Sequence, residues 1–156
     1  MQRQDHRPFY HATWVTKFRR PLLDDDLRPR LHQYLHDKVI EYGGAIMAVG
    51  GTEDHVHLVF AIPPRAELAP FIGRLKGSSS HWVNHFYNPG GDFAWQRGYG
   101  VFPVAEEELA SLCDYVRNQI DHHRLGTTVP AYEDLTKRLD SGPRAPDRRA
   151  ASRTSV

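Results

Sequence analysis

Two histidines separated by a single residue are the side chains of this sequence best suited to bind a metal ion. His55 and His57 stand in the run HVHLVFAI (55–62), whose β-branched and aromatic residues favour a strand. Side chains two apart in a strand project from the same face of the sheet, so both imidazoles could bind one ion. The same pair also fits ordinary hydrogen-bonded histidines, and by itself it leaves both interpretations open.

A tyrosine and a glutamine further along the chain could complete such a site. Tyr115 and Gln119 are four residues apart in a segment with helical spacing, so they share one face of that helix. If the helix packs over the histidines, Tyr115 could supply a nucleophilic hydroxyl and Gln119 an oxygen ligand. Taken alone, Tyr115 fits a core tyrosine with a hydrogen-bonded hydroxyl better. His122 and His123 are polar helix-end residues or a spare ligand.

The elements that must position these residues follow the order β-α-β-β-α-β-α. Strands are predicted at 9–16, 45–51, 55–62 and 93–104, and helices at 27–42, 68–86 and 106–120. The short link 52–54 between two strands predicts an antiparallel hairpin. The last strand is expected to bend at Gly98 and Gly100. This order indicates the α+β class, an antiparallel β-sheet with helices packed on it.

Length and composition exclude several classes of protein. A chain of 156 residues with 25% charged side chains fits one globular domain, expected at 1–139, followed by a disordered basic tail at 140–156. No apolar run could span a membrane and the N-terminus lacks a signal peptide, which predicts a cytoplasmic protein. The lone Cys113 excludes an internal disulfide and a cysteine-built zinc site. The absence of a glycine-rich phosphate loop predicts no nucleotide cofactor.

Basic residues gather in two short clusters although the net charge is only +1. One is Lys17-Phe18-Arg19-Arg20 and the other is Arg74-Leu75-Lys76. Each cluster alone is most often a solvated face, so neither establishes nucleic-acid binding.

Five stretches resemble, in the same order, the HUH single-tyrosine transposases, which include insertion-sequence transposases and REP-associated tyrosine transposases. The stretches are TWVTKFRRPLL (13–23), GGTEDHVHLV (50–59), LKGSSS (75–80), FAWQRGYG (93–100) and DYVRNQ (114–119). Each is short, but five in register are specific, and they cover roughly residues 9–139. Two departures, Glu53 for a usual proline and Ala105 for a serine, affect a turn and a helix cap.

The resemblance implies the ferredoxin/RRM-like HUH endonuclease fold and a metal-dependent tyrosine transposase. It implies that His55, His57 and Gln119 are the metal ligands and that Tyr115 is the nucleophile that forms a 5′-phosphotyrosine intermediate. The implied metal is Mg²⁺ or Mn²⁺, although histidine-rich ligand sets by themselves favour zinc, nickel or copper. A homodimer is also implied, in which the tyrosine helix could complete the partner's site.

Single-stranded DNA is the expected substrate, because cations and aromatic rings together hold phosphates and stack bases, and the resemblance implies that it contains a hairpin. The candidate backbone contacts are Lys17, Arg19, Arg20, Arg74, Lys76 and Arg97. The candidate stacking residues are Trp14, Trp82, Trp95, Tyr99 and Phe102, most of which should be core. Two alternatives remain: a non-catalytic single-stranded nucleic-acid-binding module, and a metal-dependent hydrolase without a covalent intermediate.

Overall fold

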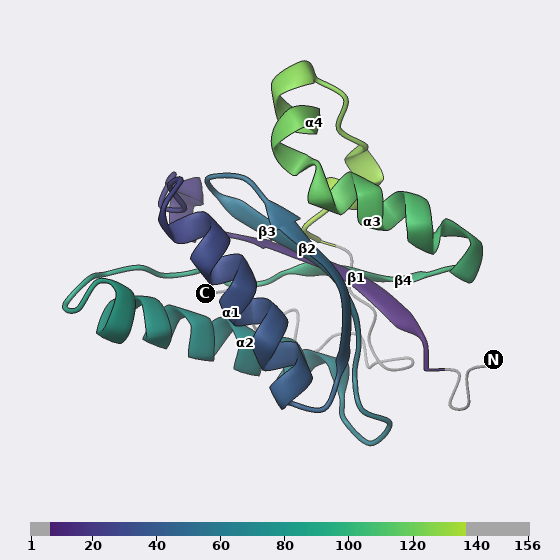
Figure 1. Ribbon diagram of the computed structural model, residues 1–156, viewed down its shortest axis with the longest axis horizontal. Coiled ribbons are helices and arrows are strands. Elements are labelled where there is room, and N and C mark those ends of the chain that lie inside the picture. The colour runs from purple at the N-terminus through teal and green to yellow at the C-terminus, as the bar shows by residue number, and fades with distance from the viewer. Residues whose placement is uncertain (1–6, 137–156) are drawn as a thin grey trace, which may run out of the picture.

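A four-stranded antiparallel sheet forms the centre of the molecule. The computed structural model describes residues 7–136, and within them the strands are ordered β2-β3-β1-β4. Their bounds are β1 (Phe9–Val15), β2 (Ala45–Gly51), β3 (His55–Ala61) and β4 (Gly100–Val104). Helices α1 (Leu27–Glu41) and α2 (Leu68–Trp82) cover one face, and α3 (Leu109–Arg117) and α4 (Gln119–Leu125) lie on the other (Figure 1). The predicted α+β class and element order are confirmed.

Strand alternation divides the buried side chains between the two faces. Trp14, Val56, Leu58 and Phe60 face α1 and α2, where they form the larger hydrophobic cluster with residues such as Leu31, Leu35 and Ile72. Val59 faces the other way and joins a smaller cluster with Leu112, Tyr115 and Val116 of α3. Burial of each such large aliphatic side chain stabilises the fold by about 1.5–3 kcal/mol. The larger cluster therefore supplies most of the stability, and the α3 face is left for polar groups.

Helix α1 begins and ends where the sequence predicts. The carboxylate of Asp24 accepts hydrogen bonds from the backbone N–H groups of Asp26 (3.1 Å) and Leu27 (2.8 Å), which satisfies donors of the first turn. Leu27, Leu31, Leu35 and Val39 form the buried face at a spacing of four residues. The turn after the helix passes through Gly43, whose φ of 92° favours glycine.

The predicted second helix is continuous through its polar middle. The hydroxyls of Ser78, Ser79 and Ser80 each donate to the backbone carbonyl three residues earlier, so these serines do not interrupt the helix. A single π-helical turn (Val83–Tyr87) then extends α2, as predicted for the region up to 86.

Two elements differ from the sequence-based predictions. Of the predicted strand 93–104, Gly100–Val104 forms β4, and Trp95 makes only an isolated antiparallel bridge to Thr16. Between them the chain turns at Gly98 (φ 90°), where Lys76 Nζ donates to the carbonyls of Gln96 (2.9 Å) and Gly98 (2.7 Å). The predicted single helix 106–120 is wrong, because Asn118 (φ −108°, ψ 32°) separates α3 from α4. The side chain of Asn118 donates to the Asp114 carbonyl (2.8 Å), which stabilises the break.

Two further expectations concern the membrane and the tail. No helix within residues 7–136 is long and apolar enough to cross a membrane. The domain limit at 139 and the tail predicted at 140–156 lie outside the described residues, and both remain predictions.

Candidate metal and tyrosine site

The two histidines of the H-x-H pair lie side by side on β3. Their side chains point to the face covered by α3, and their rings lie 5.0 Å apart. His55 is 2% exposed and His57 is fully buried. Because β3 lies between β2 and β1, its backbone is held from both sides, which makes the pair a rigid platform.

Polar residues of the β2–β3 turn orient His55. Its Nδ1 lies 2.9 Å from Asp54 Oδ1 and 3.0 Å from Thr52 Oγ1. Burial alone would raise the pKa of Asp54, but the hydrogen bond with His55 and the charges of His55 and Arg19 lower it. An ionised carboxylate only accepts hydrogen bonds, so in the His55 tautomer that donates Nδ1–H to Asp54 the lone pair of Nε2 faces the site.

His57 is oriented by a third histidine that the sequence analysis did not select. His11 of β1 places its Nε2 2.8 Å from His57 Nδ1, and their rings stack with centroids 5.1 Å apart. Burial, with a contribution from His57, lowers the pKa of His11 to about 3, so His11 is neutral. The alternation of β1 would have put His11 on one sheet face with Thr13, but only the pairing of Thr13 with His57 shows that it is this face.

A close approach of backbones sets α3 against the sheet above the histidines. A Cβ atom at Gly50 of β2 would lie 1.8 Å from the carbonyl oxygen of Val116, so only glycine permits this packing. The approach brings Gln119 Oε1 to 3.0 Å from His55 Nε2, with Gln119 1% exposed. The ring of Tyr115 lies edge-on to His57 at 6.1 Å and stacks on His122 at 4.6 Å.

Glu133 completes the cluster and was missed by the sequence analysis. It ends the 3₁₀ helix Pro130–Glu133 and places Oε1 3.1 Å from His57 Nε2 and 3.5 Å from His55 Nε2. Its Oε2 accepts a hydrogen bond from the hydroxyl of Tyr115. Although burial would raise the pKa of Glu133, the hydrogen bonds and charges of His57, Tyr115 and His55 lower it to about 2. No spacing rule links an irregular segment to a strand 76 residues away, so nothing in the sequence marks Glu133.

The environment of Tyr115 keeps its hydroxyl protonated. Burial and the hydrogen bond to Glu133 raise the pKa of Tyr115 to about 12, although the N–H of Val129 donates to its oxygen at 3.0 Å.

The two histidines of α4 have different surroundings. His123, a candidate spare ligand, has its Nε2 3.1 Å from Gln119 Oε1 and 3.6 Å from Glu133 Oε2. His122 instead bonds Thr127 at 2.8 Å and covers the tyrosine ring.

The donor atoms of this cluster fit a cation. Side-chain ligand atoms of His55, His57 and Glu133 all lie within 4.8 Å of one another, and Gln119 Oε1 is next to His55. In the tautomer that donates Nδ1–H to Asp54, the Nε2 lone pair of His55 faces two oxygens, Oε1 of Gln119 and Oε1 of Glu133. Acceptors facing one another repel unless a proton or a cation lies between them. Rotation of the Gln119 amide could relieve this repulsion in the metal-free protein, and a bound cation would select the orientation described.

Comparison with known proteins identifies the family. The family model described as "Transposase IS200 like" matches residues 6–119, most of the described chain and the segment that carries both histidines and Tyr115. The chain belongs to the IS200-like transposase family. The predicted family is therefore confirmed, and with it the HUH type of fold.

Two transposases are similar to this chain in sequence. The transposase for insertion sequence element IS200 of Salmonella typhimurium is 29% identical over 126 residues, covering 75% of this chain and 80% of the relative. The ISDra2 transposase TnpA of Deinococcus radiodurans is 27% identical over 118 residues, covering 72% and 84%.

Solved structures show the same architecture. A putative transposase from Deinococcus radiodurans superposes with a TM-score of 0.58 at 28% identity, covering 76% of this chain and 98% of the other. A REP-associated tyrosine transposase bound to a REP hairpin superposes with a TM-score of 0.57, covering 82% and 74%. At 16% identity the second likeness shows the fold alone.

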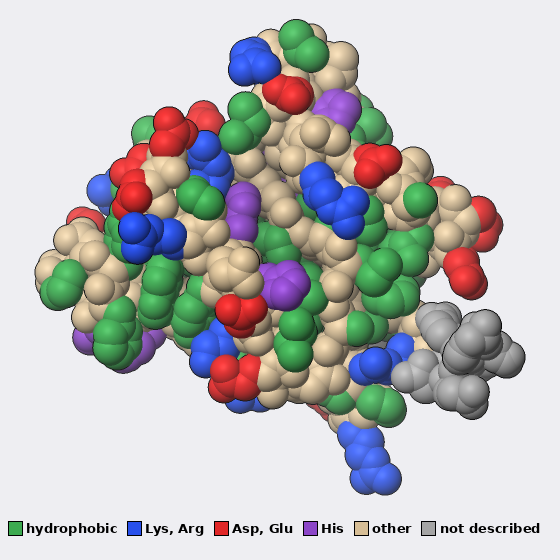
Figure 2. All heavy atoms as spheres, in the orientation of Figure 1, with side chains coloured by type: hydrophobic (Ala, Val, Ile, Leu, Met, Phe, Trp, Pro, Cys, Tyr) green, Lys and Arg blue, Asp and Glu red, His purple; other side chains and the backbone are tan. Residues whose placement is uncertain are grey.

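The basic residues predicted to contact DNA lie in different places on the transposase. Lys17, Arg19 and Arg20 are exposed beside the β2–β3 turn, where Arg19 pairs with Asp54 at 3.5 Å. Arg74 and Lys76 belong to α2 on the opposite face of the sheet; Arg74 lies over the ring of Tyr42, and Lys76 holds the loop before β4. On the face seen in Figure 2, Lys and Arg side chains are interspersed with Asp and Glu rather than gathered into one patch.

The aromatic side chains selected for base stacking are mostly part of the packing. Trp14 is fully buried. The others are half-buried against the core or the site: Trp82, Trp95, Tyr99 and Phe102. The majority therefore have structural roles, as anticipated.

Proposed function

We propose that this transposase cuts and rejoins single-stranded DNA by transesterification, with Tyr115 as the nucleophile. The observation that carries the proposal is the position of the Tyr115 hydroxyl, which is hydrogen-bonded to the same Glu133 carboxylate that contacts both histidines. A candidate nucleophilic hydroxyl and a set of potential metal-binding atoms thus belong to one largely buried cluster. This convergence supports the proposal over a binding module, which would need neither.

The reaction exchanges one phosphate ester for another. The Tyr115 oxygen attacks a DNA phosphorus atom, the bond from phosphorus to the 3′ oxygen breaks, and a proton ends on that oxygen as a 3′ hydroxyl. The downstream DNA segment stays on Tyr115 through its 5′ phosphate, as a phosphodiester that retains the energy needed for rejoining. Attack by a free 3′ hydroxyl reverses the step, so no nucleotide cofactor is required.

Glu133 Oε2 is the acceptor placed to receive the Tyr115 proton. The hydroxyl already donates to this oxygen. Since the pKa of Glu133 is lowered to about 2 and that of Tyr115 is raised to about 12, the proton would move only as the new bond to phosphorus forms. Glu133 Oε1 meanwhile faces the histidines, so the two carboxylate oxygens have separate roles. The Val129 N–H would remain bonded to the tyrosine oxygen and stabilise the developing negative charge.

We propose that His55, His57, Gln119 and Glu133 hold a divalent cation, Mg²⁺ or Mn²⁺. Such an ion would neutralise charge on the phosphate oxygens and assist departure of the 3′ oxygen. The two oxygen donors support a hard cation better than histidine alone, because carboxylate and carbonyl oxygens suit magnesium and manganese. A homodimer also remains part of the proposal.

The deciding experiment looks for a covalent protein–DNA product. A hairpin-bearing single strand is mixed with the protein and Mn²⁺ or Mg²⁺, and adducts that survive SDS are counted. Adduct from the wild-type protein and none from Tyr115→Phe is expected. Tyr34→Phe is the matched control, since Tyr34 bonds the Ser78 carbonyl on the far side of the sheet. An undiminished adduct in Tyr115→Phe would contradict the proposal, and turnover without an adduct would favour a hydrolase.

A further inference from the structure

The short 3₁₀ helix Lys17–Arg19 presents an aromatic side chain to solvent in a strained backbone conformation. Phe18 is 75% exposed, the largest fraction among the exposed large hydrophobic side chains of residues 7–136. Phe18 (φ 58°) and Arg19 (φ 52°) are also the two non-glycine residues with positive φ in the part of the chain that the structure describes. Core packing explains neither the exposure nor the strain, and strained residues of this kind cluster at ligand sites.

Hydrogen bonds from both sides hold this loop in its strained form. The N–H of Phe18 donates to Gln96 Oε1 at 2.9 Å, and the N–H of Lys17 donates to the Ala94 carbonyl at 3.0 Å. Thr16 Oγ1 donates to the Arg20 carbonyl at 2.6 Å. The outward direction of the Phe18 ring is therefore imposed by the surrounding structure and does not result from a loose segment.

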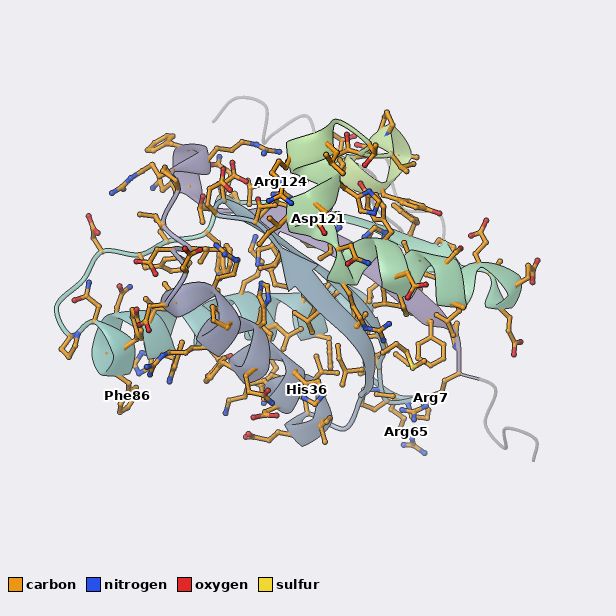
Figure 3. The ribbon with its side chains drawn as sticks, turned by 45° about the horizontal axis from the view of Figure 1, so that its top comes forward. Arg7, His36, Arg65, Phe86, Asp121 and Arg124 are labelled. Carbon is orange, nitrogen blue, oxygen red and sulfur yellow. The ribbon has the colours of Figure 1, made fainter. Side chains whose placement is uncertain are left out.

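The loop is joined directly to the histidine site. The N–H of Thr16 donates to the Asp54 carbonyl at 2.8 Å, and Arg19 Nη1 lies 3.5 Å from Asp54 Oδ2. The other carboxylate oxygen of Asp54 orients His55. Figures 1 and 3 both show the short purple helix beside the turn between β2 and β3, on the same side of the molecule as α4. The loop that carries Phe18 thus adjoins the turn that orients His55.

The charges around Phe18 suit a polyanion. Lys17, Arg19 and Arg20 are exposed, and Lys17 Nζ lies 5.5 Å from the centre of the Phe18 ring. An aromatic ring flanked by cations is the arrangement that stacks a base and neutralises the adjoining phosphates of a single strand. The whole chain has a net charge of only +1, so these three neighbouring cations form a local concentration of positive charge.

We propose that Phe18 stacks on a nucleobase of the single strand that enters the histidine site, while Lys17 and Arg20 contact the flanking phosphates. The assignment rests on the proposed function for the identity of the strand. The assignment adds a base-contacting residue that holds the DNA beside the site. It also gives a reason for the positive φ angles of Phe18 and Arg19, which direct the Phe18 ring into solvent.

Binding measured without catalysis tests this assignment. A fluorescent oligothymidylate of about 16 nucleotides is titrated in EDTA, in a Tyr115→Phe background, so that neither metal nor adduct is needed. Phe18→Ala is expected to weaken binding roughly 5- to 100-fold, and Phe18→Trp to restore it. The matched control is Phe86→Ala, since Phe86 is 71% exposed and points outward below α2 (Figure 3).

Phe18→Gly separates a ligand-binding role from a structural one. Glycine adopts positive φ without strain, so this variant should melt at or above the wild-type temperature and still lose binding. Wild-type affinity in Phe18→Ala, or equal losses in Phe18→Ala and Phe86→Ala, would overturn the proposal. The proposal would also be overturned if light scattering showed that self-association, and not DNA binding, depends on Phe18. The binding titration measures no adduct. If binding depends on Phe18 but the protein forms no adduct with DNA, the base-stacking proposal stands and only the proposed function is refuted.

Discussion

The hydroxyl of Tyr115 donates its hydrogen bond to Glu133, a residue 18 positions later that also contacts the two histidines of β3. This contact connects the candidate nucleophile with the candidate metal ligands. It also raises the pKa of Tyr115, after the larger effect of burial, so the tyrosine rests as a neutral hydroxyl.

Replacement of Glu133 by glutamine should slow covalent capture of DNA. The amide keeps the size of the side chain but cannot accept the Tyr115 proton as a carboxylate does, so adduct formation should fall roughly 100-fold. Rates from quenched time courses on SDS gels measure this effect. Glu106→Gln, which alters an exposed acid at the start of the α3 region, should react at the wild-type rate. Equal rates for both variants would exclude Glu133 as the proton acceptor.

Metal affinity should depend on His11 as well as on the ligands themselves. His55→Ala and His57→Ala should abolish Mn²⁺ binding in calorimetric titrations. His11→Phe keeps a ring against Phe102 but removes the partner of His57 Nδ1, and should weaken binding about 10- to 100-fold. His36→Gln on α1 serves as the control, because His36 pairs with Asp37 away from the site. Unchanged affinity in His11→Phe would show that His57 needs no orienting partner.

Stability should fall as the solution is acidified below about pH 6.5. The pKa of buried His11 is lowered to about 3 and that of His32 to about 4, so the unfolded chain binds protons that the folded chain rejects. The unfolding free energy therefore decreases between pH 6.5 and these values. Glu133, with its pKa lowered to about 2, adds a further loss below about pH 4.5.

Urea unfolding at a series of pH values checks the acid sensitivity. His32→Gln should reduce the slope of unfolding free energy against pH by about one proton between pH 4 and 6.5. His36→Gln should leave the slope unchanged. A flat profile for the wild-type protein would contradict the assignment of neutral buried histidines.

Addition of a methyl group at Gly50 should displace α3 from the sheet. The new Cβ would meet the Val116 carbonyl at 1.8 Å, so Gly50→Ala should destabilise the protein by about 1–3 kcal/mol and abolish adduct formation. Gly73→Ala is a control for which the opposite change in stability is expected. Gly73 lies in α2 with open space around its Cβ position, so alanine there should stabilise by about 0.5–1 kcal/mol. Thermal melting of the two variants distinguishes them, and similar effects would refute the close-approach explanation.

Tyr115 should act on the histidines of its own chain. In this structure its hydroxyl reaches Glu133, which contacts His55 and His57 of the same chain. A mixture of Tyr115→Phe and His57→Ala proteins should then form no more adduct than either alone. Recovery of activity in the mixture would show instead that the tyrosine helix completes the site of a partner chain.

The sequence alone determined which side chains share a face of a strand or helix, because local periodicity relates them. Alternation along 55–62 put His55 and His57 on one face, and helical spacing made Leu27, Leu31, Leu35 and Val39 the buried face of α1. The break at Asn118 was missed, because it depends on one side chain bonding the Asp114 carbonyl rather than on a helix-breaking residue. The strand predicted at 93–99 is reduced to a bridge at Trp95, since the chain turns at Gly98 and Lys76, on another element, bonds the carbonyls there.

Only the tertiary structure decided which residues meet at the site. His11 and Glu133 reach His57 across 46 and 76 residues of chain, and Gln119 reaches His55 across 64. Alternation tells which side chains share a face, but the packing of α3 at Gly50 and the path of the segment after α4 determine what lies opposite. Such contacts arise from the burial of surfaces distant in the chain, which no local pattern records.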